Sequence, residues 1–222
     1  MCFSATADFA GSAVLGVVGV ATLREVKHPR EVMFAAMPCL FALHQFTEGF
    51  VWLGLDGTLP RSAVHDAGAA YALYAQGILP LLLPLSVLLL EPTRRKRMQM
   101  LGFTILGGAL MLYMLWGLIA YPLDISVQQN SIVYRNIVTT TTPVAELYVI
   151  ATCGSLFFSG FSELVLLGWA NLIGLLIVMA VRRYAFTSIW CAYAAVVSVI
   201  IYAFFRRSRT ARIAMYDLLP VI

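Results

Sequence analysis

Long apolar stretches, separated by short polar or charged connectors, run along almost the whole chain. Most of them are about 20 residues long, the length that an α-helix needs to cross roughly 30 Å of hydrocarbon. A segment inside hydrocarbon must satisfy its own backbone hydrogen bonds, and a helix does so. The pattern therefore predicts an all-α, polytopic transmembrane bundle of about seven helices. The predicted spans are residues 3–23, 31–55, 67–91, 98–121, 143–158, 164–181 and 186–205.

Prolines and one polar insert interrupt this pattern. Pro80 and Pro84 fall inside the third predicted span and should kink it, since each removes a backbone hydrogen bond. Residues 122–142 are polar and rich in β-branched residues, with alternation between Ser126 and Tyr134. Such a segment favours extended structure over helix. We predict an exposed insert there, with a short β-hairpin at the membrane surface as a candidate form.

The composition supports the bilayer as the solvent of this chain. Of its 222 residues, 61% are hydrophobic and only 12% are charged. A soluble domain of this size needs a polar coat that so few charged residues cannot supply. We therefore expect residues 1–205 to form one transmembrane domain and residues 206–222 a basic cytoplasmic tail.

The net charge of +4 does not indicate a nucleic-acid partner, because the basic residues form short clusters between the apolar stretches. With the N-terminus outside, most of these clusters fall on the cytoplasmic side, where the positive-inside rule places them. We therefore predict an outside N-terminus, a cytoplasmic C-terminus and contacts with anionic lipid headgroups. The expected headgroup contacts are Arg94, Arg95, Lys96, Arg97, Arg206 and Arg207.

Glu48 is the first candidate for chemistry, because a carboxylate inside an apolar span is costly unless it is protonated, paired or facing a cavity. His44 lies four residues earlier and thus on the same helix face, and Gln45 adds polarity nearby. The His–Glu pair is a candidate acid–base couple or metal site. A structural pair that ties helices together is the alternative interpretation.

The predicted topology brings further polar or thiol-bearing residues to the same outer half of the bundle. The N-terminus, the outer half of the second span and the starts of the fifth and seventh spans share that side. The residues expected to converge there with His44, Gln45 and Glu48 are Cys2, Glu146, Ser188, Trp190 and Cys191.

A thiolate, an imidazole and a carboxylate together suit zinc best among the common divalent metals. We therefore predict Cys2, His44 and Glu48 as candidate zinc ligands. The metal would activate water against an ester or amide, with Glu48 and His44 as catalytic residues. Alternatively, Cys2 is an anchor or the disulfide partner of Cys191.

Three segments resemble a family of bacterial multi-pass membrane proteins of unknown function: MCFSATADF, PCLFALHQFTEGFVWLGL and FTSIWCAYAAVVSVIIY. The resemblance extends from Met1 to about Phe205. It implies a location in the bacterial cytoplasmic membrane and no particular activity. The recurrent features of the family fall on Cys2, Phe3, Ser4, Gln45, Glu48, Gly49, Trp52, Ser188, Trp190 and Cys191.

Three functions remain open from the sequence. The first is a metal-dependent intramembrane hydrolase of lipid or amide substrates. The second is a non-catalytic subunit that contacts other membrane proteins through the insert and the tail. The third is a transporter of protons or a small solute, in which Glu48 takes up and releases a proton.

Overall fold

The computed structural model describes residues 4–128, 131–181, 186–208 and 212, and these residues are mostly helical. The helical segments are α1 (Ala5–Arg24), η1 (Pro29–Glu31), α2 (Val32–Ala35), α3 (Met37–Leu55), α4 (Arg61–Ala72), η2 (Leu73–Ile78), α5 (Leu79–Leu90), α6 (Arg94–Ala120), α7 (Thr142–Phe157), α8 (Ser162–Val181) and α9 (Phe186–Arg207). The strands β1 (Asp124–Gln128) and β2 (Ser131–Arg135) form an antiparallel hairpin.

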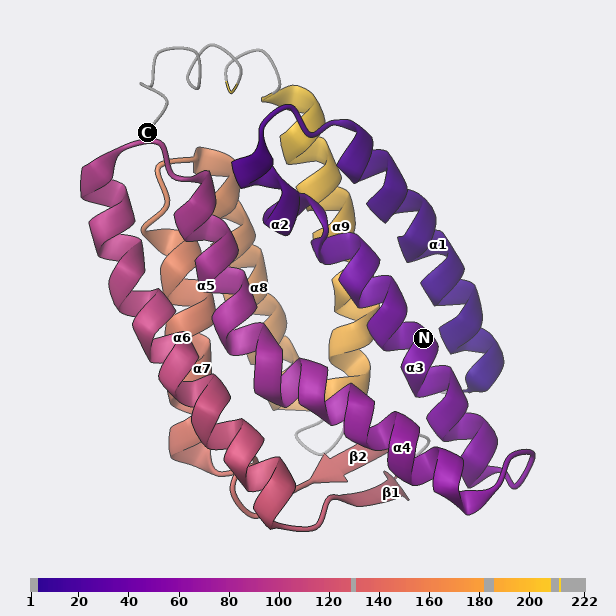
Figure 1. Ribbon diagram of the computed structural model, residues 1–222. Helices are drawn as coiled ribbons and strands as arrows, with labels where there is room; N and C mark the ends of the chain where they lie inside the picture. The colour runs from indigo at the N-terminus through magenta and orange to yellow at the C-terminus, as the bar shows by residue number, and fades with distance from the viewer. Residues whose placement is uncertain (1–3, 129–130, 182–185, 209–211, 213–222) are drawn as a thin grey trace.

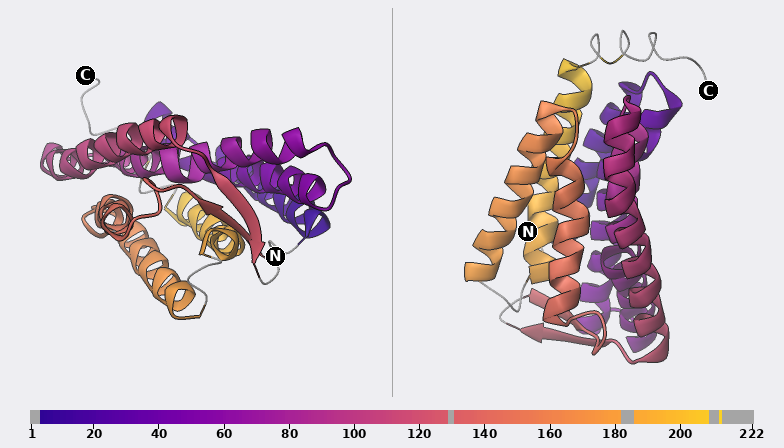
Figure 2. Two further views of the ribbon diagram at one scale, coloured as in Figure 1. Left: turned by 90° about the horizontal axis from the view of Figure 1, so that it is seen from below. Right: turned by 90° about the vertical axis from the view of Figure 1, so that its left-hand side faces the viewer.

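The helices run alternately up and down and form two layers (Figures 1 and 2). One layer holds α1, α3, the continuous α4–η2–α5 rod and α6, and the other holds α7, α8 and α9. Helix α9 packs against α1 and α3, while α7 packs against α5 and α6, so the two layers share an interior. The hairpin lies across the end of the bundle at which α3 ends and α4 begins. The prediction of a mostly helical chain with a short hairpin is confirmed.

Three helical segments in the described part of the chain are long and apolar enough to cross a membrane, judged by length and composition: Ala5–Arg24, Arg61–Leu90 and Arg94–Ala120. Large apolar side chains are exposed on the outer faces of the bundle. Val17 of α1 is 72% exposed, Ile105 of α6 is 64% exposed and Leu166 of α8 is 63% exposed. A soluble monomer rarely exposes apolar surface on this scale, so these faces fit a lipid environment.

Two helices differ in extent from the predicted spans. The second predicted span is not one helix: η1, α2 and α3 are separate segments, and α3 starts afresh with Pro38 in its first turn. Proline fits that position because the N–H group it lacks would have no helical partner there. Helix α6 begins at Arg94 rather than at residue 98, so the basic run is helical. Arg and Lys are good helix formers, and this favours the longer helix.

The polar insert is less exposed than predicted. In the described part of the hairpin, four of the five residues of β2 are buried. Ile132 and Tyr134 of this strand pack with Val51 of α3 and Tyr71 of α4 in one apolar cluster. The strand is buried because it closes the end of the bundle, whereas the sequence suggested an insert lying on the membrane surface.

The predicted kink in the third span takes the form of a π-helical segment, η2, just before Pro80. The N–H group of Leu79 donates to the carbonyl of Tyr74, five residues earlier. The same spacing would pair Pro80 with Ala75, but proline has no N–H group to donate. The Tyr148 hydroxyl of α7 donates to the Ala75 carbonyl instead, at 2.9 Å. Helix α7 thus supplies the hydrogen bond that the Ala75 carbonyl cannot receive from Pro80.

Tyr148→Phe is expected to lower the free energy of unfolding by about 1–2 kcal/mol, because the partly buried Ala75 carbonyl would lose its donor. Tyr113→Phe is the matched control, since Tyr113 is 45% exposed on α6. The measurement is denaturant unfolding of both variants in mild detergent. Equal stabilities of the two variants would contradict this role of Tyr148.

Candidate functional site

A polar group is buried between α1 and α3, inside otherwise apolar helices. Asp8 of α1 and Glu48 of α3 are both 0% exposed, and Gln45 is 2% exposed. The side-chain amide of Gln45 donates to the Asp8 carboxylate at 3.4 Å. Glu48 lies three residues after Gln45 and therefore on the same face of α3. The two helices thus bury two carboxylates, and the amide of Gln45 hydrogen-bonds to one of them, Asp8.

Small residues allow α1 and α3 to approach closely around this group. A Cβ atom on Gly11 would lie 2.5 Å from the amide nitrogen of Gln45, so a side chain there would displace the amide. The Ser12 hydroxyl donates to the Ala42 carbonyl at 2.8 Å and fixes the two helices against each other. Near the start of α1, the Ser4 side chain accepts from the Ala7 N–H group and caps the helix.

His44, predicted to act together with Glu48, packs against two tyrosines. Its imidazole stacks on the Tyr71 ring, with centroids 3.8 Å apart, and also contacts Tyr74 at 4.8 Å. The His44 Nδ1 atom is buried and has no hydrogen-bond partner among the described residues. The two residues do share a helix face, but the tyrosines of α4 and η2 occupy the space around the imidazole.

The hairpin extends this stack of rings. The Tyr71 ring stacks on Tyr134 of β2, with centroids 4.3 Å apart. A column of three rings therefore runs from α3 through α4 to β2, and it connects the predicted site residue His44 to the strand that closes the bundle.

Of the remaining predicted site residues, Glu146 alone has a side chain in the described part of the chain. Glu146 is on α7, and its side chain is exposed. Cys2 lies outside the described residues, and so do the side chains of Ser188, Trp190 and Cys191. Within the described part of the chain, no group of three or more His, Cys, Asp or Glu side chains is placed to hold a metal ion.

Asp8 was missed by the sequence reasoning. It is the one carboxylate within the first apolar stretch, and the cost of burying a charge applies to it as much as to Glu48. Applying the Glu48 argument to every carboxylate in an apolar stretch would have identified it.

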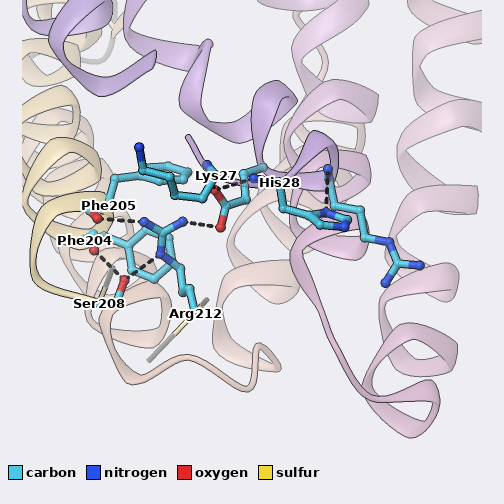
Figure 3. Close-up of polar contacts among 8 residues, drawn as sticks. Lys27, His28, Phe204, Phe205, Ser208 and Arg212 are labelled. Atoms are coloured by element: carbon cyan, nitrogen blue, oxygen red, sulfur yellow. Dashed lines mark hydrogen bonds and ion pairs between the residues drawn. The ribbon is translucent and has the colours of Figure 1, made fainter. Parts of the chain in front are cut away.

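A second polar cluster, drawn in Figure 3, lies at the opposite end of the bundle, where α9 ends next to α2 (Figure 1). Glu31 and Arg212 are 0% and 1% exposed and form an ion pair. The other carboxylate oxygen of Glu31 accepts from the Lys27 N–H group at 2.8 Å. The Arg212 guanidinium also donates to the Phe205 carbonyl at 2.7 Å and lies 4.5 Å from the centre of the Phe205 ring. These contacts fasten Arg212 to the end of α9 and to the turn before α2.

A fourth buried carboxylate, Glu91, lies at the same end, just after α5. It is 0% exposed and accepts from the Ser159 hydroxyl at 2.5 Å and from the Gly160 N–H group at 2.7 Å. It therefore holds the turn between α7 and α8 in place.

A model of a family of unknown function, DUF6629, matches residues 1–216. The chain belongs to this family. The match covers both buried carboxylates of the α1–α3 interface and the Glu31–Arg212 pair. Neither the curated proteins nor the solved structures contain a match. The predicted membership of a family without assigned activity is thus confirmed.

Proposed function

We propose that the chain is a multi-pass protein of the bacterial cytoplasmic membrane with an outside N-terminus and a cytoplasmic C-terminus. The distribution of basic residues supports this orientation. Among the described residues, the end of the bundle with the Glu31–Arg212 pair carries most of the Lys and Arg side chains, and the hairpin end carries Arg61 and Arg135. Basic residues concentrate on the cytoplasmic side of membrane proteins.

The buried group of Asp8, Gln45 and Glu48 is, in this proposal, a proton-binding site of a proton-transferring transporter. The observation that carries it is the complete burial of two carboxylates in neighbouring helices. A carboxylate inside a membrane is expensive and usually marks an ion or proton pathway. The Gln45 amide can hydrogen-bond to either protonation state of Asp8, so the site tolerates both gain and loss of a proton.

A metal-dependent intramembrane hydrolase is the second proposal. It is supported by the free Nδ1 atom of His44, which is buried without a hydrogen-bond partner among the described residues and is one helical turn from Glu48. The Cys2 thiol would have to complete the zinc site. His44→Phe separates the two proposals, because it preserves the stack on Tyr71 and removes the metal ligand. If the wild-type chain binds zinc or hydrolyses a substrate and His44→Phe does not, the hydrolase is favoured.

Proton flux into proteoliposomes tests the first proposal. Asp8→Asn and Glu48→Gln are near-isosteric changes that prevent proton release, and we expect each to reduce flux to the level of protein-free liposomes. Glu146→Gln is the matched control, because it removes an exposed carboxylate from α7 and should leave flux unchanged. An internal pH-sensitive dye reports the rate. Flux that persists in the Asp8→Asn/Glu48→Gln double variant would remove these residues from the pathway.

A further inference from the structure

The four consecutive basic residues at the start of α6 divide into two pairs with different surroundings. The Lys96 ammonium donates to the Phe158 carbonyl at 2.9 Å, and the Arg97 guanidinium donates to the Glu91 carbonyl at 2.7 Å. These two side chains hold neighbouring turns of the protein itself. Arg94 and Arg95 are exposed, and neither makes a hydrogen bond or ion pair with the described part of the chain.

Arg94 and Arg95 border an open hollow of about 660 Å³, which Met98 and Gln99 complete. The hollow therefore combines two guanidinium groups, an amide and an apolar side chain. A guanidinium binds a phosphate through two parallel hydrogen bonds, and an amide can add another.

An apolar stripe continues from this hollow along the same side of α6. Met98 is 61% exposed, Leu101 39% and Ile105 64%. Residues three or four positions apart lie above one another on a helix, so these side chains form a continuous strip below the two arginines. Cations at the head of an apolar strip match the chemistry of a phospholipid, with its phosphate above and its acyl chains below.

We propose that this face of α6 is a binding site for an anionic phospholipid. Its phosphate lies between Arg94 and Arg95, and an acyl chain follows Met98, Leu101 and Ile105. The site rests on the membrane orientation proposed above, which places the start of α6 in the cytoplasmic leaflet. Of the four basic residues at the start of α6 that were expected to contact headgroups, the site uses only Arg94 and Arg95. Lys96 and Arg97 already donate hydrogen bonds to carbonyls of the protein itself.

Native mass spectrometry of the full chain in nonionic detergent tests this site. The probes are phosphatidylglycerol, phosphatidylcholine and inorganic phosphate. We expect the wild-type chain to retain phosphatidylglycerol in preference to phosphatidylcholine. Arg94→Gln/Arg95→Gln should weaken phosphatidylglycerol binding by about 25-fold, taking roughly fivefold for each basic residue near an anionic headgroup. Both residues are exposed, so the variant should fold normally.

Arg206→Gln/Arg207→Gln is the matched control, since it removes two exposed arginines from the same end of the bundle. We expect it to cause a clearly smaller loss than the α6 variant. Equal losses in the two double variants would indicate a diffuse attraction and overturn the site. Displacement of the lipid by inorganic phosphate at equal concentration would overturn the lipid assignment. A chain that stays in the membrane fraction after an alkaline wash but shows no lipid preference would refute this site alone, leaving the membrane proposal intact.

Discussion

Replacing Arg212 by methionine is expected to lower the free energy of unfolding by about 3–5 kcal/mol, the largest effect of any single substitution considered for this chain. The reason is the complete burial of both partners, because Glu31 would keep its charge in an apolar interior without the guanidinium. The N–H group of Lys27 would still contact the carboxylate but carries no charge. Methionine preserves much of the packing against Phe205.

Denaturant unfolding in mild detergent measures this loss, and Arg207→Met is the matched control. Arg207 is exposed at the end of α9, so the control should stay within about 0.5 kcal/mol of the wild type. Adding Glu31→Gln to Arg212→Met should restore part of the loss, since the uncompensated charge is then gone. Equal stabilities of Arg212→Met and Arg207→Met would show that the buried pair of Glu31 and Arg212 does not stabilise the bundle.

Gly107→Ala is expected to give the second-largest effect, a loss of about 1–3 kcal/mol from overpacking. A Cβ atom on Gly107 would overlap the carbonyl oxygen of Pro80, come within 2.9 Å of its carbonyl carbon and lie 3.1 Å from the Leu81 Cα atom. These are backbone atoms, which cannot move aside as a flexible side chain can. The substitution should therefore push α6 away from α5 just where Pro80 follows the π-helical segment.

Gly102→Ala on the same helix is the control, and it is expected to raise the free energy of unfolding where Gly107→Ala lowers it. Nothing lies within 4 Å of a Cβ atom at Gly102, so alanine meets no obstacle there. Alanine is a better helix former than glycine and should stabilise the chain by up to about 1 kcal/mol. Unfolding curves of the two variants in one detergent give the comparison. A Gly107→Ala variant as stable as Gly102→Ala would contradict the close approach of α5 and α6.

The helices and strands of this fold were predictable from the sequence where the pattern of neighbouring residues determines the element. Apolar length predicted the helices, and alternation between Ser126 and Tyr134 predicted the hairpin. The burial of β2 was not predictable, because it depends on Val51 and Tyr71, which are distant in the sequence. The kink at Pro80 was expected, but its π-helical form depends on a donor from Tyr148 of another helix.

The candidate site was predictable only in part, because local sequence patterns do not show contacts between distant residues. The cost of a buried carboxylate identified Glu48, whose side chain is completely buried. The spacing of His44 and Glu48 placed them on one face, but it could not show that Tyr71 stacks on the imidazole. The Glu31–Arg212 pair joins residues 181 positions apart, and no local pattern connects them.

In the function proposed above, Asp8 and Glu48 take up and release a proton inside the membrane. Infrared difference spectroscopy of the reconstituted protein during a pH step measures this directly through the carboxyl C=O band. We predict a band change in the wild type that Glu146→Gln retains and that Asp8→Asn and Glu48→Gln each reduce. A band change of wild-type size in the Asp8→Asn/Glu48→Gln double variant, or no change in the wild type at any accessible pH, would contradict the claim.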